Sequence, residues 1–330
     1  MAAAEYPRTL GEFDRRFATE DGCRQYLVGV RWPAGFRCPR CLSDNAWLTK
    51  RGLMHCKGCG HQTSITAGTI FHGTRSSLRL WFQAMWWVTA QKNGASALGL
   101  QRILGLGSYE TAWTWLHKLR RAMVRPGRDR LSGDVEVDET FVGGVEEGGG
   151  RRHVGKKVLI AVAVEIRGTA LGRIRLQRIL DSSAESLLPF VRDAVTPGSR
   201  VITDGWSSYL GVTDAGYLHK RLVVRGGGEA ATTLLPRVHR VASLLKRWLL
   251  GTHQGRPDRA HLPYYLDEFT FRFNRRAARH RGLLFYRLLQ QAVAVDPAPV
   301  PAPGWRSGSR GSHKILSPLE RRGYVSRGYR

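Results

Sequence analysis

Two acidic segments carry the residues best suited to metal-dependent chemistry. Acidic and apolar residues alternate over residues 134–142, as they do in a β-strand, so Asp134, Glu136 and Asp138 are expected on one face. A second apolar strand ends at Asp204. Carboxylates delivered from neighbouring strand ends can hold Mg²⁺, and two such ions can promote phosphodiester cleavage. The alternative is that these are ordinary carboxylates at the surface ends of strands.

A helix expected over residues 234–250 adds two candidates for the same chemistry. His239 and Lys246 are separated by seven residues, or two helical turns, so they lie on one face. Such a pair could hold a cation and grip the adjoining phosphate. Arg240 and Arg247 repeat the spacing on a neighbouring face, where they are candidate DNA contacts. The alternative is a basic amphipathic helix with an incidental histidine.

The cysteines indicate a second, different metal site. Four of the five form two Cys-x-x-Cys pairs, Cys38 with Cys41 and Cys56 with Cys59. This spacing is typical of tetrahedral Zn²⁺ held by four thiolates, which leaves no open position and makes the zinc structural. The alternative, four reduced structural cysteines, requires this spacing to arise by chance. Cys23 is expected to be a lone buried thiol.

Several elements must position these residues. We expect a lead-in helical segment at residues 1–30, a zinc ribbon at 31–75, a helical DNA-binding segment at 76–127, an α/β catalytic domain at 130–292 and a basic tail rich in Pro, Gly and Arg at 293–330. Strands of the catalytic domain are expected at residues 134–142, 156–166, 171–180, 200–203 and 220–224, and its helices at 184–195, 234–250 and 262–273.

The helical segment has the pattern of a helix-turn-helix. Helices expected at residues 96–104 and 109–124 are separated by a glycine-containing turn, and the second carries Lys118 and Arg121 on a basic face that could contact DNA. The alternative is an ordinary helical packing unit with solvated charges. Three tryptophans of the preceding helix are assigned to the core rather than to base stacking: Trp81, Trp86 and Trp87. The lead-in segment is expected to hold one helix over residues 13–27.

The composition favours a polyanionic partner. The 330 residues carry 52 Lys plus Arg against 26 Asp plus Glu, a formal net charge of +26, and 42% are hydrophobic. Such a chain can bury a core and is predicted to bind nucleic acid. It has no apolar run long enough to cross a membrane and no apolar signal-peptide segment at its start, so we expect a cytoplasmic protein.

Several motifs, in order, resemble a known family. The segments VEVDETFVGG, VITDGWSSYLGV, HRVASLLKRWLLGTHQG and YYLDEFTFRFNRR resemble the catalytic domain of bacterial insertion-sequence transposases of the ISXO-like group. The ribbon, with CPRC, CKGCG and ITAGTIFHGTR, is similar to the N-terminal domain that those transposases carry. The resemblance covers roughly residues 15–292. It implies an RNase H-like fold and metal-dependent DNA strand transfer at the inverted repeats of an element.

By this resemblance, Asp138 and Asp204 would be the first and second ligands of a catalytic Mg²⁺ or Mn²⁺, His239 the third, and Lys246 the lysine of the family. The third ligand in such enzymes is usually Glu, so His239 is a departure. Its neutral imidazole adds no charge and suits Mn²⁺ better than Mg²⁺. Two carboxylates are minor alternatives: Glu139 and Glu268.

The predicted function is that of a transposase acting on double-stranded DNA, both element ends and target, as a homodimer or larger synaptic complex at the nucleoid. Arg275 and Arg276, in the last motif, either contact the DNA backbone or are solvated. Two other classes stay open: a catalytically inactive, zinc-ribbon DNA-binding regulator and a metal-dependent, structure-specific nuclease. A regulator need not hold a divalent cation, and a nuclease need not recognise element ends.

Overall fold

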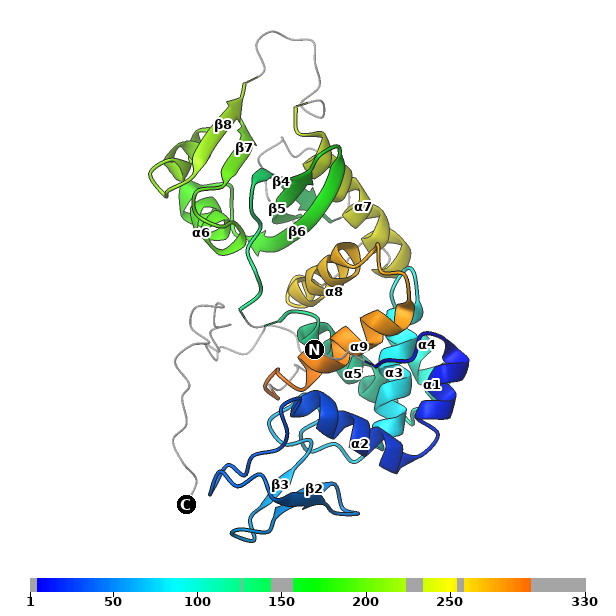
Figure 1. Ribbon diagram of the computed structural model, residues 1–330. Helices are drawn as coiled ribbons and strands as arrows, with labels where there is room; N and C mark the ends of the chain where they lie inside the picture. Colours follow the sequence, from blue (N-terminus) through cyan, green and yellow to red (C-terminus); the bar gives the residue numbers. More distant parts are fainter. Residues whose placement is uncertain (1–4, 126, 144–156, 224–233, 254–257, 298–330) are drawn as a thin grey trace, which may run out of the picture. The chain divides into compact units, whose positions relative to one another are not determined.

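A computed structural model describes residues 5–125, 127–143, 157–223, 234–253 and 258–297 (Figure 1). The basic tail expected at residues 293–330 lies outside the described residues from residue 298 onward. The ribbon contains a three-stranded antiparallel sheet in the order β1-β2-β3, formed by β1 (Ala46–Leu48), β2 (Leu53–Cys56) and β3 (Gln62–Ser64).

Six helices surround a hydrophobic core that contains many aromatic side chains, called the aromatic cluster below. They are α1 (Leu10–Arg16), α2 (Glu20–Arg31), α3 (Leu78–Ala90), α4 (Ala97–Leu104), α5 (Tyr109–Ala122) and α9 (Arg281–Ala292). The first five begin at hydroxyl N-caps whose side chains accept a bond from a backbone N–H of the first turn: Thr9, Thr19, Ser77, Ser96 and Ser108. Gly105, with φ 62°, ends α4 and makes the turn of the expected helix-turn-helix pair.

One helix prediction was wrong. A single helix was expected over residues 13–27, but the chain forms α1 and α2. The break falls at Thr19, which has extended backbone and caps α2 by accepting a bond from the Gly22 N–H at 3.2 Å. Phe13 of α1 and Phe17, which ends α1, are almost fully buried in the aromatic cluster.

Helix α9, near the end of the described residues, completes the hydrophobic core between these helices. Phe285 of α9 is fully buried and packs against Phe13 and Phe82, with ring centroids 5.4 and 5.7 Å apart. Trp81 and Trp86 are also buried, 1% and 9% exposed, and Trp87 is half-buried against the cluster. The assignment of these tryptophans to the core is therefore confirmed.

The α/β part is built on a five-stranded mixed sheet in the order β6-β5-β4-β7-β8. Its strands are β4 (Asp134–Val142), β5 (Val158–Arg167), β6 (Ala170–Ile179), β7 (Arg200–Asp204) and β8 (Leu218–Leu222). The central β4 pairs antiparallel with β5 and parallel with β7. This mixed sheet flanked by helices confirms the expected RNase H-like α/β class.

Helices cover both faces of this sheet (Figure 1). On one face lie α7 (Pro236–His253) and α8 (Leu262–Asn274), and on the other α6 (Ala184–Ala194) and the short η1 (Ser207–Val212). Side chains of β5 alternate between the two layers: Ile160 and Val162 pack towards α7 and α8, whereas Ala161 and Ala163 pack towards α6 and η1. A continuous apolar run is therefore what a strand buried on both faces requires.

A buried charge cluster links α5 to α8. Glu268 is 1% exposed, and its carboxylate accepts a bond from Arg120 Nε at 2.7 Å and another from Arg272 Nη2 at 2.7 Å. Arg272 also donates to the backbone carbonyls of Val88 and Gln91 at the end of α3. Burial opposes the charged form, but the two guanidiniums lower the pKa of Glu268 to about 2. Glu268 therefore has a structural role, and its carboxylate has no place in a metal site.

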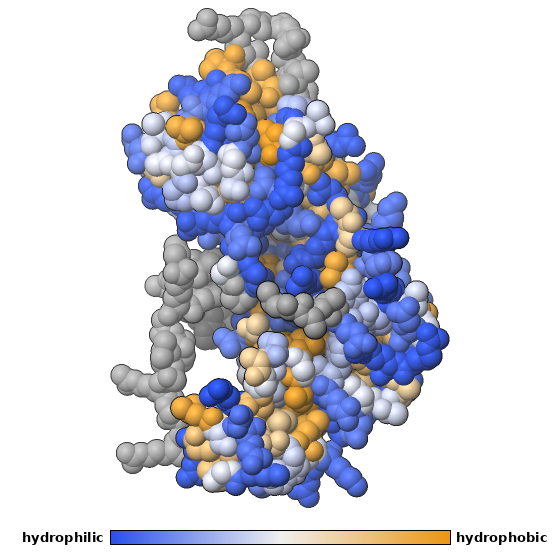
Figure 2. Space-filling view, in the orientation of Figure 1, coloured by the Kyte–Doolittle hydropathy of each residue, from blue (hydrophilic) through white to orange (hydrophobic). Residues whose placement is uncertain are grey.

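The visible surface is mostly hydrophilic, with apolar residues in separate patches (Figure 2). In the described part of the chain, no helix has the length and apolar character needed to cross a membrane.

Replacing Glu268 by Gln tests the charge cluster. We expect a loss of about 3–5 kcal/mol of unfolding free energy at neutral pH, because two buried guanidiniums lose their counter-charge. The folded pKa of Glu268 lies below the unfolded value of about 4.3, so its stabilisation is present above that value and disappears as the pH falls towards 2. Urea unfolding, followed by circular dichroism from pH 6 to pH 2, should show the stability gap narrowing with acid. A gap that stays constant over this range would contradict the assigned ionisation.

Candidate functional site

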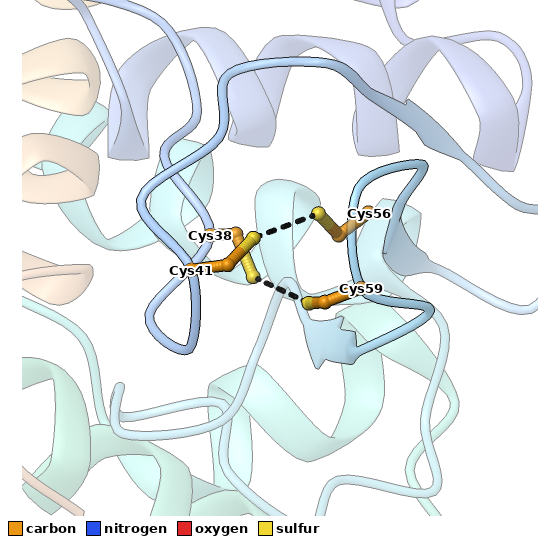
Figure 3. A group of neighbouring side chains, drawn as sticks. All are labelled: Cys38, Cys41, Cys56 and Cys59. Carbon is orange, nitrogen blue, oxygen red and sulfur yellow. Dashed lines mark hydrogen bonds between the residues drawn. The ribbon is translucent and has the colours of Figure 1, made fainter.

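The four paired cysteines converge in the ribbon (Figure 3). Their sulfur atoms all lie within 4.8 Å of one another, with Cys38 Sγ 3.6 Å from Cys59 Sγ and Cys41 Sγ 3.5 Å from Cys56 Sγ. Four sulfurs at 2.3 Å from a tetrahedral Zn²⁺ would be about 3.8 Å apart, so this cluster fits the ion closely. A structural zinc is thereby supported for the ribbon. Cys23 lies apart from it, fully buried in α2, as expected.

Two tight turns hold the sulfurs in place. Leu42 follows the first Cys-x-x-Cys pair with φ 61°, and Gly60 follows the second with φ 70°. Left-handed backbone at the same position in both turns reverses the chain and lets both cysteines of a pair face one ion. Burial opposes ionisation of Cys38, but the backbone N–H groups of Cys41 and Arg40 lower the pKa of its thiol to about 7. The first turn therefore favours the thiolate form of Cys38, whereas the neighbouring cysteine sulfurs raise the pKa of Cys41.

The second candidate site lies on two adjacent parallel strands, with Asp138 in the middle of β4 and Asp204 at the carboxyl end of β7. The pairing of β4 with β7 brings Glu136 opposite Ile202, and two residues further along the same strands are Asp138 and Asp204. Both aspartates therefore lie on the face of the sheet that α7 covers. Asp204 Oδ1 accepts a bond from the Trp206 N–H at 3.0 Å, which orients its carboxylate at the strand end.

The electrostatics of Asp138 support the proximity of this pair. Burial raises the pKa of Asp138 to about 7; the N–H of Glu139 opposes this shift, and the negative charges of Asp204 and Glu136 add to it. Like charges held together in a buried place are unfavourable unless a proton or a cation neutralises them. The donor set therefore suits a divalent cation.

Helix α7 brings His239 to the same place. His239 Nε2 lies 3.7 Å from Asp138 Oδ2, beyond hydrogen-bond distance, and its side chain is 31% exposed. Among the described residues, the four cysteine sulfurs are the one group of three or more potential ligands that all lie within 4.8 Å of one another. The donor atoms of Asp138, Asp204 and His239 are therefore spaced more widely than the sulfurs. The structure places His239 beside Asp138, and the charge of Asp204 acts on Asp138, while the role of the three residues as metal ligands stays a prediction.

Two lysines, Lys246 and Lys157, lie close enough for their charges to interact. Lys246 is exposed on α7 two turns after His239, and burial and the charge of Lys157 lower the pKa of its ammonium. Lys157 immediately precedes β5, whose start pairs with the end of β4. The sequence analysis missed Lys157, because its only signal was a lysine before an apolar run. Two neighbouring ammonium groups are suited to holding phosphate oxygens, and a role for Lys246 at the candidate site stays a prediction.

Glu139 faces the other layer. Its carboxylate accepts a bond from the hydroxyl of Tyr209, which is fully buried in η1, at 2.8 Å. Burial raises the pKa of Glu139 to about 7, against the effect of this hydrogen bond. Side chains alternate along a strand, so Glu139 and the adjacent Asp138 point to opposite faces of the sheet. Glu139 therefore lies outside the proposed ligand set.

The predicted DNA contacts differ in their surroundings. Arg240 and Arg247 are exposed on α7. On α5, Lys118 and Arg121 are half-buried, and this helix buries most of its surface, including Trp113, Trp115 and His117. Only a narrow polar stripe of α5 therefore faces solvent. The roles of these four basic residues in DNA binding stay predictions.

Arg275 and Arg276 make contacts within the fold. The guanidinium of Arg275 lies over the ring of Phe271, 4.1 Å from its centroid, and burial lowers its pKa to about 10. Arg276 donates to the carbonyl of Gly172 in β6 at 3.2 Å and lies over Phe273. These contacts give both arginines a structural role, and contact with DNA stays a prediction for them.

The fold joins a zinc ribbon to an RNase H-like domain that carries acidic residues on two adjacent parallel strands. Residues 18–62 match the family model of a transposase zinc-ribbon domain, and residues 130–274 match that of an ISXO2-like transposase domain. The chain belongs to the ISXO2-like insertion-sequence transposases and is a DNA transposase.

One curated protein and several solved structures are similar to this chain. An uncharacterised protein in transposable element ISH50 of Halobacterium salinarum is 26% identical over 281 residues, covering 78% of this chain and 92% of that protein. A chain of a simian T-cell lymphotropic virus intasome is similar at TM-score 0.31 and 13% identity, over 66% of this chain and 77% of that one. A chain of the Mos1 strand transfer complex is similar at TM-score 0.29 and 13% identity, over 68% and 77%.

Zinc content tests the cysteine cluster. We expect about one zinc per chain in the wild type and its loss in Cys56→Ser, because a tetrahedral thiolate site needs all four sulfurs. The matched control is Cys23→Ser, which changes a buried thiol of α2 outside the cluster and should keep the metal. Mass spectrometry of the purified proteins gives the content. Equal zinc in both variants would contradict the assignment.

Proposed function

We propose that this transposase cleaves and joins DNA at the terminal inverted repeats of an insertion sequence, using Asp138, Asp204 and His239 to hold Mg²⁺ or Mn²⁺. The observation that carries the proposal is the position of the two aspartates on adjacent parallel strands, Asp138 in the middle of β4 and Asp204 at the end of β7, with His239 Nε2 3.7 Å from Asp138 Oδ2. A divalent cation, when bound there, supplies activation of the attacking oxygen and stabilisation of the leaving oxygen.

The reaction consists of two displacements at phosphorus. In the first, the oxygen of water bonds to the phosphorus at the element end, the bond to the 3′ oxygen breaks, and a 3′-hydroxyl and a 5′-phosphate result. In the second, that 3′-hydroxyl oxygen attacks a phosphodiester of target DNA and displaces a target 3′ oxygen. Neither step needs a covalent bond between DNA and protein.

The side chains around the acidic group have distinct tasks in this proposal. The ammonium group of Lys246 holds the phosphate beside the cut, and its exposed position leaves it accessible to DNA. Arg240 and Arg247, exposed on the same helix, contact flanking phosphates. His239 contributes a neutral nitrogen, so the set carries one negative charge fewer than three carboxylates would.

The remaining parts of the chain bind the element ends. The ribbon contributes seven basic residues against one acidic residue over residues 31–75, and the narrow polar stripe of α5 contributes Lys118 and Arg121. We infer that a homodimer or larger complex brings two element ends together, and that the protein acts on DNA of the nucleoid in the cytoplasm.

Exchanging Asp138 for Asn tests the proposed site. We expect cleavage of end-containing DNA to fall by about 10²–10³-fold, as when one electrostatic partner of the transition state is removed. Asp134→Asn is the matched control: it lies on the same face of β4, but its carboxylate accepts a bond from Arg200 Nε at 2.8 Å. The control should cleave at nearly the wild-type rate in Mg²⁺ or Mn²⁺.

Three results would count against the proposal. Full activity of Asp138→Asn or Asp204→Asn would remove the assigned site. Equal cleavage of random and repeat-containing DNA would favour a structure-specific nuclease. Repeat-specific binding without metal binding or cleavage would favour an inactive regulator.

The histidine ligand predicts a metal preference. His239→Glu adds an oxygen donor and a negative charge, so we expect the ratio of the cleavage rate in Mg²⁺ to that in Mn²⁺ to rise several-fold. Initial rates measured at saturating concentrations of each metal give the ratio. An unchanged ratio would show that His239 does not contact the metal.

A further inference from the structure

Glu136 makes a contact that the acidic pattern of β4 does not suggest. Its side chain is 3% exposed. Oε2 accepts bonds from the backbone N–H of Arg237 at 2.8 Å and of Val238 at 2.9 Å, and Oε1 accepts from Arg237 Nη1 at 3.0 Å. A buried carboxylate is stable only with such partners.

The two backbone donors belong to the first turn of α7. N–H groups in the first turn of a helix have no acceptor within the helix, and the positive end of the helix dipole favours a carboxylate there. An N-cap side chain usually comes from the residue just before the helix. Here the acceptor is a strand residue about 100 positions earlier in the chain. The contact therefore joins the start of α7 directly to β4.

The strand β4 and the helix α7 also carry residues of the candidate site, two positions beyond this contact on each element. Two residues after Glu136, on the same face of β4, is Asp138, and two residues after Arg237 on α7 is His239. Their side chains lie 3.7 Å apart, from His239 Nε2 to Asp138 Oδ2. Glu136 accepts three hydrogen bonds from α7, so its carboxylate serves the helix and is not a fourth metal ligand.

We propose that Glu136 is a positioning residue, which by capping α7 sets the place of His239 and Lys246 relative to Asp138 and Asp204. This inference rests on the proposed function, because the ligand set that Glu136 aligns is the one assigned there. A rigid shift of the first turn of α7 moves His239 directly.

Glu136→Gln is the direct test. The variant keeps the size of the side chain and one acceptor oxygen, but loses the charge and the second acceptor. We expect Mn²⁺ affinity, measured by electron paramagnetic resonance without DNA, to weaken by about 10–100-fold, as for other residues that orient metal ligands. The kcat for end cleavage should fall by about 100-fold, the effect of misplacing reacting groups by about 1 Å. The KM for DNA should change little, since the exposed basic residues are unaltered.

Glu165→Gln is the matched control. Glu165 is a buried glutamate of the neighbouring strand β5, 4% exposed, and its carboxylate accepts bonds from Arg173 and Arg167. Its loss weakens the sheet without touching α7. At a temperature where circular dichroism shows both variants folded, the control should keep the wild-type Mn²⁺ affinity and kcat.

The outcomes separate the two claims. Wild-type Mn²⁺ affinity and kcat in Glu136→Gln, or an equal loss of both in Glu165→Gln, would overturn the positioning role. If wild-type protein does not cleave element ends, the proposed function fails, yet the Mn²⁺ titration still decides whether Glu136 aligns the ligands. Should Glu136→Gln not fold, Glu136→Asp replaces it: the carboxylate is kept but is one methylene shorter, and Mn²⁺ affinity should again weaken, by about tenfold.

Discussion

The contact between the carboxylate of Glu136 and the first turn of α7 is the constraint on which the candidate site depends. It ties the central strand of the sheet to a helix that the chain reaches about 100 residues later. The packing of α7 against β5 buries apolar surface, but it does not fix the position of the helix along the sheet. A helix that is shifted along a sheet can bury a similar apolar area. A carboxylate bonded to two N–H groups and one guanidinium allows one position, and in that position His239 faces Asp138.

Charge distribution is the second organising feature. In a chain with a formal net charge of +26, most buried acids have arginine partners: Glu268 with Arg120 and Arg272, Glu165 with Arg173. Asp138 differs, because its close charged neighbours are other carboxylates and a histidine 3.7 Å away. Burial and these neighbours raise its pKa to about 7. An excess of positive charge favours DNA binding, and in the proposed function the acidic group is the place where a metal cation, rather than an arginine, meets the phosphate.

Much of the architecture, including most strands and the zinc ribbon, could be predicted because the spacing of apolar, acidic and cysteine residues within a short segment determines it. The alternation in residues 134–142 predicts β4 with the observed bounds, and the cysteine spacing predicts the ribbon. The break at Thr19 was also present as a signal, a hydroxyl residue before two acids, but it was overlooked. The sequence did not predict α9. Its apolar face packs on helices about two hundred residues earlier in the chain, such as α3, and a local sequence pattern does not identify such a distant partner.

The site was harder to predict residue by residue. Asp134, Glu136 and Asp138 share a face and look equivalent in the sequence, yet they have three different surroundings: an ion pair with Arg200, a helix cap, and the group with Asp204 and His239. Strand periodicity gives the face of a side chain but not its partner. Likewise, nothing in the run of arginines at residues 275–276 shows that both guanidiniums lie against rings of α8.

The central claim is that His239 and the two aspartates bind one divalent cation. Pulsed electron paramagnetic resonance of the Mn²⁺-loaded protein, prepared with isotopically labelled histidine, reports a directly bound nitrogen. The account predicts a hyperfine coupling to one histidine nitrogen in the wild type, and its disappearance in His239→Ala while Mn²⁺ stays on the carboxylates. A bound Mn²⁺ without histidine coupling in the wild type, or a coupling that persists in the variant, would contradict it.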